Sequence, residues 1–199
     1  MKIIRYALWA LVVTVAGAVG YISFTTVREA NSVQQLSEAV QIGGPFELTA
    51  MTGEPFDTSS MDGAPYAIFF GFTYCPDVCP TTLFEMSTWL ETLGDDADNV
   101  QALFVTVDPE RDTPEVLSDY VSAFGDRIMG LTGTPAEIGT VARAHRVFYQ
   151  RTELDDGDYT MDHTASVFLF RGDGSFFGTI AYGEAADSAQ EKLKRLAKT

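Results

Sequence analysis

The segment YAIFFGFTYCPDVCP (Tyr66–Pro80) joins an apolar run to the two cysteines of this 199-residue chain. The run Tyr66–Phe72 has the length of a strand and contains no charged residue, which is typical of a strand buried in the middle of a sheet. It leads directly into a loop that contains Cys75 and Cys79. We therefore expect a central strand that leads directly into the cysteine loop.

A helix is expected directly after the cysteine loop. Pro80 suits the first position of a helix, and apolar residues follow at helical spacing from Leu83 to Leu93, before Gly94. Each cysteine precedes a proline, which favours extended backbone. We expect Cys75 and Cys79 to lie in a looped turn at the N-terminal approach to this helix, and not on one of its faces.

The rest of the chain alternates between strand and helix patterns. The expected elements are a hairpin of Phe46–Thr49 and Glu54–Asp57, a strand Val100–Val107, a helix from Thr113 to about Gly125, a strand Ile128–Leu131, a helix from a capping box at Thr134–Glu137 to about Val147, paired strands Ser166–Phe170 and Phe176–Tyr182, and a helix Ala186–Lys198. This order predicts an α/β sandwich with a central sheet flanked by helices.

The N-terminal region has the pattern of a membrane anchor. Residues 6–27 carry no charge, and a helix of this length spans about 33 Å, enough for a bilayer core of about 30 Å. Lys2 and Arg5 precede the run and no acidic residue occurs before Glu29. This bias favours a cytoplasmic N-terminus. We expect a transmembrane helix within residues 1–27, a tether at 28–44 and a domain at 45–199.

A cleaved signal peptide is the alternative, because Ala16-Gly-Ala18 resembles a cleavage site. The apolar run continues past this site to Phe24, which favours a retained anchor. Both interpretations export the domain, and no Arg- and Ser-rich transit segment precedes the span. We expect a single-pass protein of a bacterial inner membrane with its domain in the periplasm.

The net charge argues against one class of partner. It is −15 for the whole chain, and residues 1–28 contribute three positive charges and no negative one, so the exported part carries −18. Nucleic-acid binding requires a basic surface and is excluded on this ground. The acidic charge serves either solubility or the attraction of a cationic partner or metal.

The cysteine pair is poorly placed for a structural disulfide. A ring of about five residues contributes roughly 2 kcal/mol, against about 4.7 kcal/mol for a hundred-residue loop. Reversible dithiol chemistry or binding of a soft metal are the remaining roles, with an inert disulfide as the alternative. Backbone N–H groups and the helix dipole at this position are expected to lower a thiol pKa.

A third metal ligand has to come from one of two histidines. His145 falls on the Ile138 and Val141 side of its expected helix, so we expect a boundary histidine satisfied by a hydrogen bond. His163 immediately precedes the strand Ser166–Phe170, whose approach can lie beside the cysteine loop. Two thiolates and an imidazole form a soft set that suits copper, since structural zinc almost always takes four protein ligands.

Four motifs together resemble the Sco/SenC family of membrane-anchored copper proteins, which help assemble the CuA centre of cytochrome c oxidase. They are GFTYCPDVCP at residues 71–80, DPERDT at 108–113, GLTGT at 130–134 and DHT at 162–164, and the similarity runs from about Gly44 to the C-terminus. The resemblance implies a thioredoxin-like fold and one copper ion per domain. It carries copper ligation onto Cys75, Cys79 and His163, and suggests that Asp77, Asp108 and Asp162 help shape the site.

Two functions follow from the resemblance and the residues. The first is a metallochaperone that delivers copper to, or prepares, the CuA-bearing subunit of cytochrome c oxidase, with other copper chaperones or thiol reductants as further partners. The second is an enzyme, a thiol–disulfide reductase acting through Cys75 and Cys79. The two roles can coexist, because metal loading requires the dithiol form. A peroxiredoxin-like peroxidase is disfavoured, because neither cysteine has Thr three residues before it and Pro four before that.

Overall fold

The computed structural model describes Tyr21, residues 41–155 and residues 157–199. The chain divides into two units, Met1–Gln41 and Ile42–Thr199, and the second contains the cysteines and both histidines. Apart from Tyr21, the expected transmembrane helix lies outside the described residues, as does most of the expected tether. In the part that is described, no helix has both the length and the apolar character needed to cross a membrane.

A seven-stranded sheet forms the centre of the domain, in the order β2-β1-β5-β4-β3-β8-β9. The strands are β1 Glu47–Ala50, β2 Pro55–Asp57, β3 Tyr66–Gly71, β4 Gln101–Thr106, β5 Ile128–Thr132, β8 Ser166–Phe170 and β9 Phe176–Ala181. β3 pairs in parallel with β4 and antiparallel with β8. All six residues of β3 are buried, which confirms the prediction that the strand before the cysteines is central.

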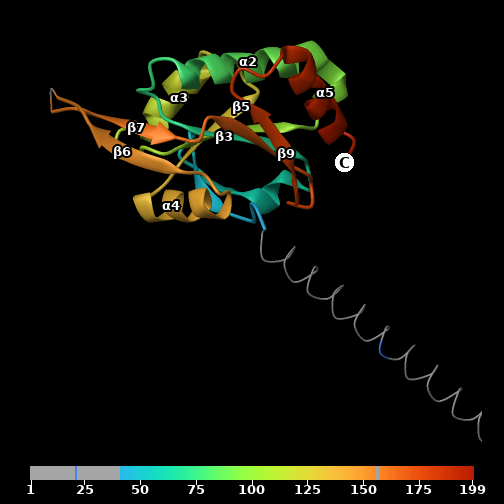
Figure 1. The fold of residues 1–199 in the computed structure, drawn as a ribbon, viewed down its shortest axis with the longest axis horizontal. Coiled ribbons are helices and arrows are strands. Elements are labelled where there is room, and N and C mark those ends of the chain that lie inside the picture. Colours follow the sequence, from blue (N-terminus) through green and yellow to red (C-terminus); the bar gives the residue numbers. More distant parts are fainter. Residues whose placement is uncertain (1–20, 22–40, 156) are drawn as a thin grey trace, which may run out of the picture. The chain divides into compact units, whose positions relative to one another are not determined.

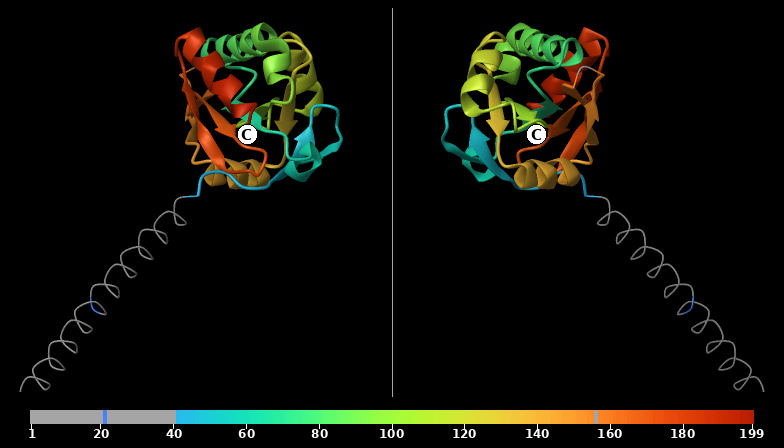
Figure 2. Two further views of the ribbon diagram at one scale, coloured as in Figure 1. Left: turned by 90° about the vertical axis from the view of Figure 1, so that its right-hand side faces the viewer. Right: turned by 90° about the vertical axis from the view of Figure 1, so that its left-hand side faces the viewer.

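Helices cover both faces of this sheet (Figures 1 and 2). They are α2 Val78–Leu93, α3 Pro114–Ser122, α4 Pro135–Ala144 and α5 Ala186–Leu196, with short 3-10 helices η1 Thr58–Met61 and η2 Gly94–Ala97. α2, α3 and α5 lie on one face and α4 on the other. The predicted thioredoxin-like α/β sandwich is confirmed.

α2 begins earlier than predicted. Its first residue is Val78, so Cys79 lies in the first helical turn and not in the preceding loop. Pro80 therefore occupies the third helical position, where its missing N–H costs no intrahelical hydrogen bond. The next helical N–H, on Thr81, donates to the carbonyl of Asp77 at 3.1 Å. The expectation that both cysteines lie in a looped turn was wrong for Cys79.

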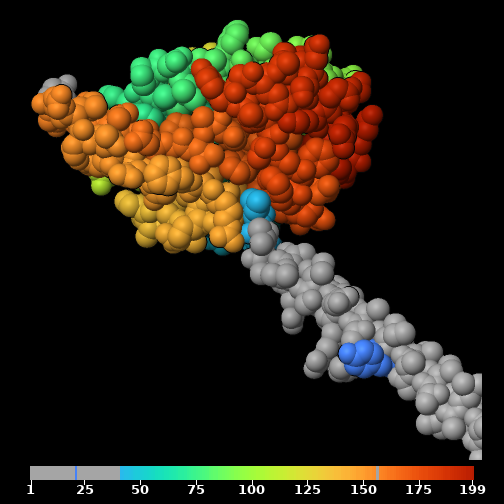
Figure 3. Space-filling view, in the orientation of Figure 1, coloured from blue at the N-terminus to red at the C-terminus, as the bar shows by residue number. Residues whose placement is uncertain are grey.

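A second sheet was not predicted from the sequence. β6 Tyr149–Glu153 and β7 Tyr159–His163 pair with each other in an antiparallel hairpin that forms its own two-stranded sheet. The hairpin extends beyond the rest of the domain (Figure 3). Among the residues of these two strands, all of which are described, only Met161 is buried. His163 is thus the last residue of a hairpin strand.

His145 is a core residue, and its assignment to the boundary was wrong. α4 ends at Ala144, because Arg146 adopts a left-handed conformation with φ of 58°. The turn places His145 fully inside the core, where its ring lies against the rings of Phe46, Phe70 and Phe170 at centroid distances of 5.5, 5.5 and 5.1 Å.

The predicted hydrogen bond of His145 is present on one ring nitrogen. Nδ1 lies 2.8 Å from the carbonyl oxygen of Val141. A carbonyl only accepts, so Nδ1 donates and Nε2 keeps a lone pair, for which the described residues offer no partner. Burial lowers the pKa of His145 below its ordinary value of 6.5.

Replacing this histidine is expected to change how stability depends on pH. Below pH 6.5 the unfolded chain takes up a proton on His145 that the folded core disfavours, so the free energy of unfolding falls as the pH falls. This contribution is at most about 1.4 kcal/mol per pH unit. Between pH 7.5 and 5.5 we expect the free energy of unfolding, measured with urea, to fall less for His145→Phe than for the parent. Parallel losses in the two proteins would contradict the burial of a neutral imidazole.

Candidate metal centre

The loop between β3 and α2 places one sulfur at a helix N-terminus. Cys79 is fully buried and Cys75 is partly exposed. The backbone N–H of Cys79 donates to Cys75 Sγ at 3.4 Å, and it is one of the first helical N–H groups that have no partner within the helix. The prediction that helix N–H groups lie beside the thiols is confirmed at Cys75.

The pKa values of the two thiols are shifted in opposite directions. The pKa of Cys75 is lowered, first by a hydrogen bond from the Cys79 side chain, with further help from the backbone N–H groups of Asp77 and Cys79. The pKa of Cys79 is raised by the same sulfur–sulfur hydrogen bond and by burial. When the pair has lost one proton, the negative charge is therefore favoured on Cys75 and the remaining proton on Cys79. A metal ion that takes both sulfurs as thiolates must displace that remaining proton.

His163 presents a free lone pair to the cysteines. Its Nδ1 lies 3.2 Å from the carbonyl oxygen of Thr164 and acts as the donor there, so Nε2 is the basic nitrogen. Nε2 lies 3.4 Å from Cys79 Sγ. The rings of Phe69 and Phe72 flank the imidazole, each at a centroid distance of 5.9 Å, and restrict its orientation.

The three candidate ligand atoms converge. The sulfurs of Cys75 and Cys79 and a ring nitrogen of His163 all lie within 4.8 Å of one another. Metal–sulfur and metal–nitrogen bonds of about 2.0–2.3 Å place two ligands of one ion at most about 4.6 Å apart. The arrangement therefore fits a single soft ion after adjustments of a few tenths of an ångström. The predicted approach of His163 to the cysteine loop is confirmed.

The three aspartates suggested by the resemblance differ in their surroundings. Asp108 is buried and accepts hydrogen bonds from Arg111 and from the Tyr159 hydroxyl. Asp77 precedes α2 without a capping hydrogen bond from its side chain. Asp162 is exposed and accepts a hydrogen bond from Thr152 within the hairpin at 2.8 Å. The roles of Asp77, Asp108 and Asp162 at the site stay predictions.

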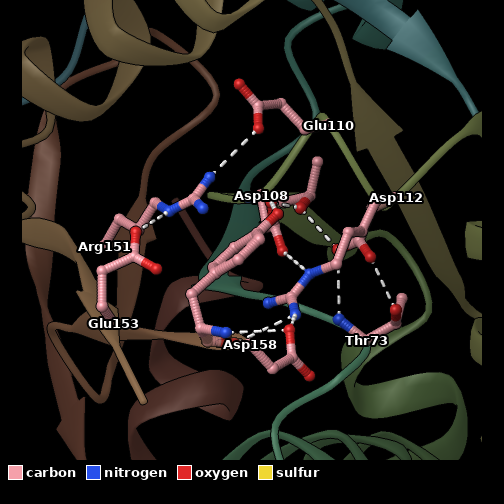
Figure 4. A network of polar contacts seen from close by, with 10 residues as sticks. Thr73, Asp108, Glu110, Asp112, Arg151, Glu153 and Asp158 are labelled. Atoms are coloured by element: carbon pink, nitrogen blue, oxygen red, sulfur yellow. Dashed lines mark hydrogen bonds and ion pairs between the residues drawn. The ribbon is translucent and has the colours of Figure 1, made fainter. Parts of the chain in front are cut away.

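Asp112 supports the cysteine loop, although sequence reasoning assigned it no role. Its side chain is fully buried, and its two oxygens accept hydrogen bonds from Thr73 N (3.0 Å), Thr73 Oγ1 (2.6 Å) and Thr106 Oγ1 (2.6 Å). Figure 4 shows Asp112 and Thr73 facing each other. Thr73 lies two residues before Cys75, so the carboxylate fixes where the loop leaves the sheet. Burial raises the pKa of Asp112.

The chain matches the SCO1/SenC family over residues 34–198. It is 34% identical over 188 residues to "Protein SCO1 homolog 1, mitochondrial" of Arabidopsis thaliana, covering 89% of this chain and 56% of that protein. It is 43% identical over 138 residues to "Protein SCO1 homolog, mitochondrial" of Homo sapiens, covering 68% and 46%. The chain thus spans about half the length of these relatives.

The fold is also similar to that of a solved structure with metal bound. The structure of Bradyrhizobium japonicum ScoI with copper bound superposes with a TM-score of 0.72 at 48% sequence identity. The match covers 78% of this chain and 99% of that one. The similarity therefore extends over nearly the whole of that solved chain.

The unequal thiols give a testable difference in reactivity. At pH 6 we expect iodoacetamide to modify Cys75 much faster than Cys79, as measured by peptide mass spectrometry. Cys79→Ala removes the hydrogen bond that stabilises the Cys75 thiolate and is expected to slow modification of Cys75 by at least about tenfold. In the reciprocal variant, Cys75→Ala, buried Cys79 should remain slow. Equal rates for Cys75 in the parent and in Cys79→Ala would contradict this assignment.

The absence of a side chain at Gly71 leaves space for the Cys79 sulfur. A comparison with Gly178, which has open space around it, tests whether this space is required. A Cβ atom at Gly71 would lie 2.7 Å from Cys79 Sγ and 2.8 Å from Phe104 Cε2. Gly71→Ala is expected to lower the free energy of unfolding by about 1–3 kcal/mol. Gly178→Ala in β9 meets no atom within 4 Å and should change it by less than about 0.5 kcal/mol. Equal effects in urea unfolding would show that Gly71 is not sterically required.

Proposed function

The chain belongs to the SCO1/SenC family, and we propose that it is a copper metallochaperone that delivers copper to, or prepares, the CuA centre of cytochrome c oxidase. The observation that carries the proposal is the convergence of the Cys75, Cys79 and His163 ligand atoms within 4.8 Å. Two thiolates and one imidazole are ligands that suit copper. The Bradyrhizobium ScoI structure, 48% identical to this chain, holds copper.

The cargo in this proposal is one copper ion held by Cys75, Cys79 and His163. Cys79 is fully buried, whereas Cys75 is partly exposed. An acceptor thiolate therefore approaches from the Cys75 side and replaces that ligand first. Cys79 and His163 keep the ion until the acceptor supplies its further ligands, so copper moves by ligand exchange without release to solvent.

Thiol–disulfide reduction is the second candidate, favoured by the Cys75 thiolate beside a buried thiol. The Cys75 thiolate attacks a partner disulfide, forms a mixed disulfide and releases one partner thiolate. Cys79 gives up its proton and attacks Cys75 Sγ, which closes an intramolecular disulfide and releases the second partner thiolate. Two electrons pass to the partner, and the Cys79 proton passes to solvent or to a released thiolate.

The proposal includes a location outside the cytoplasm. We infer from the sequence that residues 1–27 anchor the chain in the inner membrane and that the acidic domain lies in the periplasm. Support comes from the uncharged run at residues 6–27 and from the positive charges before it. The proposed partner is the oxidase subunit that carries CuA.

Copper titration of ligand variants tests the proposal. The reduced domain is expected to bind one copper ion. Loss of supporting residues around a metal site costs about 10–100-fold in affinity, so loss of a direct ligand should exceed about 100-fold. We expect this loss for Cys75→Ala, Cys79→Ala and His163→Ala in competition with a chromogenic Cu(I) chelator. Parent-like affinity in all three variants would refute the proposed site.

A second histidine supplies the control. His145→Phe alters a core residue and should keep the copper affinity of the parent within about twofold. The same set separates the two candidate functions. If the chain also acts as a reductase, we expect the His163→Ala variant to reduce a partner disulfide at the parent's rate although it has lost copper binding.

A further inference from the structure

The β6–β7 hairpin needs a support outside the main sheet. It forms a separate two-stranded sheet, and among its strand residues only Met161 is buried. A two-stranded hairpin by itself is marginally stable in water. His163 is the last residue of this hairpin. The contacts that hold the hairpin against the domain therefore also determine the position of the His163 backbone and imidazole.

Arg111, in the loop after β4, makes polar contacts with the hairpin. Its Nε donates to the carboxylate of Asp108. Its Nη1 donates to the backbone oxygen of Tyr159 at 3.0 Å and lies 3.4 Å from the Asp158 carboxylate. The Arg111 side chain is 16% exposed and that of Asp108 is 4% exposed. The ion pair is therefore largely shielded from water and from screening by salt.

The same guanidinium also lies over two aromatic rings. The Cζ atom of Arg111 lies 4.6 Å from the centre of the Tyr74 ring and 3.7 Å from that of Tyr159. Arg151, in β6, also lies over the Tyr159 ring, at 3.6 Å. The Tyr159 hydroxyl donates to Asp108 at 2.9 Å. Cation–π contacts of this kind strengthen when they are shielded from water.

The contacts join the two segments that carry the candidate ligands. Tyr74 is the residue before Cys75, and Tyr159 begins the strand that ends at His163. We propose that Arg111 is a positioning residue that fastens the β6–β7 hairpin to the cysteine loop and so holds His163 in register with Cys75 and Cys79. The inference rests on the proposed copper function for its consequence, and Arg111 itself touches none of the three ligands.

Packing at the base of the hairpin is the rival explanation. The rings of Phe69 and Phe72 contact the His163 imidazole directly. They restrict the orientation of the ring, whereas the backbone of His163 is paired with Tyr149 and moves with the hairpin. If ring packing alone positions His163, loss of Arg111 will leave the copper affinity unchanged.

A thermodynamic cycle between Arg111 and His163 tests the positioning role. Copper affinity is measured for the parent, Arg111→Gln, His163→Ala and the double variant. We expect Arg111→Gln to weaken copper binding by about 10–100-fold when His163 is present. In the His163→Ala background the same substitution should cost less than about twofold, because no imidazole remains to be positioned. Equal losses in both backgrounds, or no loss in either, overturn the inference.

Arg127 provides a matched control. It is a partly buried arginine whose guanidinium donates to the carbonyls of Leu90 (3.1 Å) and Ala97 (2.8 Å), and it has no described contact with the hairpin. Arg127→Gln therefore also removes the hydrogen bonds of a partly buried guanidinium, but in another part of the domain. It should change copper affinity by less than about twofold in either background. A loss equal to that of Arg111→Gln overturns the inference.

A second variant covers the case in which Arg111→Gln fails to fold. Tyr159→Leu removes the ring between Arg111 and Arg151 but keeps the Arg111–Asp108 ion pair. Without copper, we expect amides paired between β6 and β7 to exchange with deuterium at least about tenfold faster in this variant, and those of β3 to be unchanged. Unchanged exchange in the hairpin overturns the inference. If the parent fails to bind copper, the proposed function is refuted, and hydrogen exchange alone decides whether Arg111 holds the hairpin.

Discussion

The buried carboxylate of Asp112 is the interaction on which the geometry of the site depends. β3 and β4 run in parallel, with Gly71 opposite Thr106, so the loops after them leave the same edge of the sheet. Asp112, in the second loop, accepts two hydrogen bonds from Thr73 in the first. A buried carboxylate without such donors would be strongly unfavourable. Its burial therefore requires the two loops to stay together, and this fixes the start of the cysteine loop.

The asymmetry of the cysteine pair results from this placement. Because the loop leads into α2, Cys79 enters the first helical turn and is buried, while Cys75 remains at the surface and accepts the helix N–H. The helix N-terminus and the shared proton both favour a thiolate at Cys75. The same arrangement suits copper exchange and disulfide exchange, since both require an accessible sulfur backed by a second, protected one.

The sequence predicted those elements whose burial or capping requires a recognisable run or spacing of residue types. β3 reads as a continuous apolar run, and the Thr134–Glu137 capping box marks the start of α4. The β6–β7 hairpin creates no such pattern, because only Met161 of its strand residues is buried. Its contacts with the rest of the domain include polar and cation–π contacts to Arg111, which is distant in sequence. His145 was wrongly predicted to lie at the boundary of the core. Its burial depends on the left-handed conformation of Arg146, and an arginine in the sequence does not indicate such a conformation.

For the site, the sequence alone identified the chemistry. Two cysteines spaced around a proline after a buried strand, with a histidine available, limit the candidates to soft-metal and thiol chemistry, and those residue identities are independent of folding. The tertiary structure decided the geometry: which sulfur is exposed, which histidine reaches them, and which nitrogen it presents. These depend on long-range contacts, Asp112 with Thr73 and Arg111 with Tyr159, whose partners are 39 and 48 residues apart in the sequence. Local spacing carries no information about such contacts, because they form only when the sheet has brought the loops together.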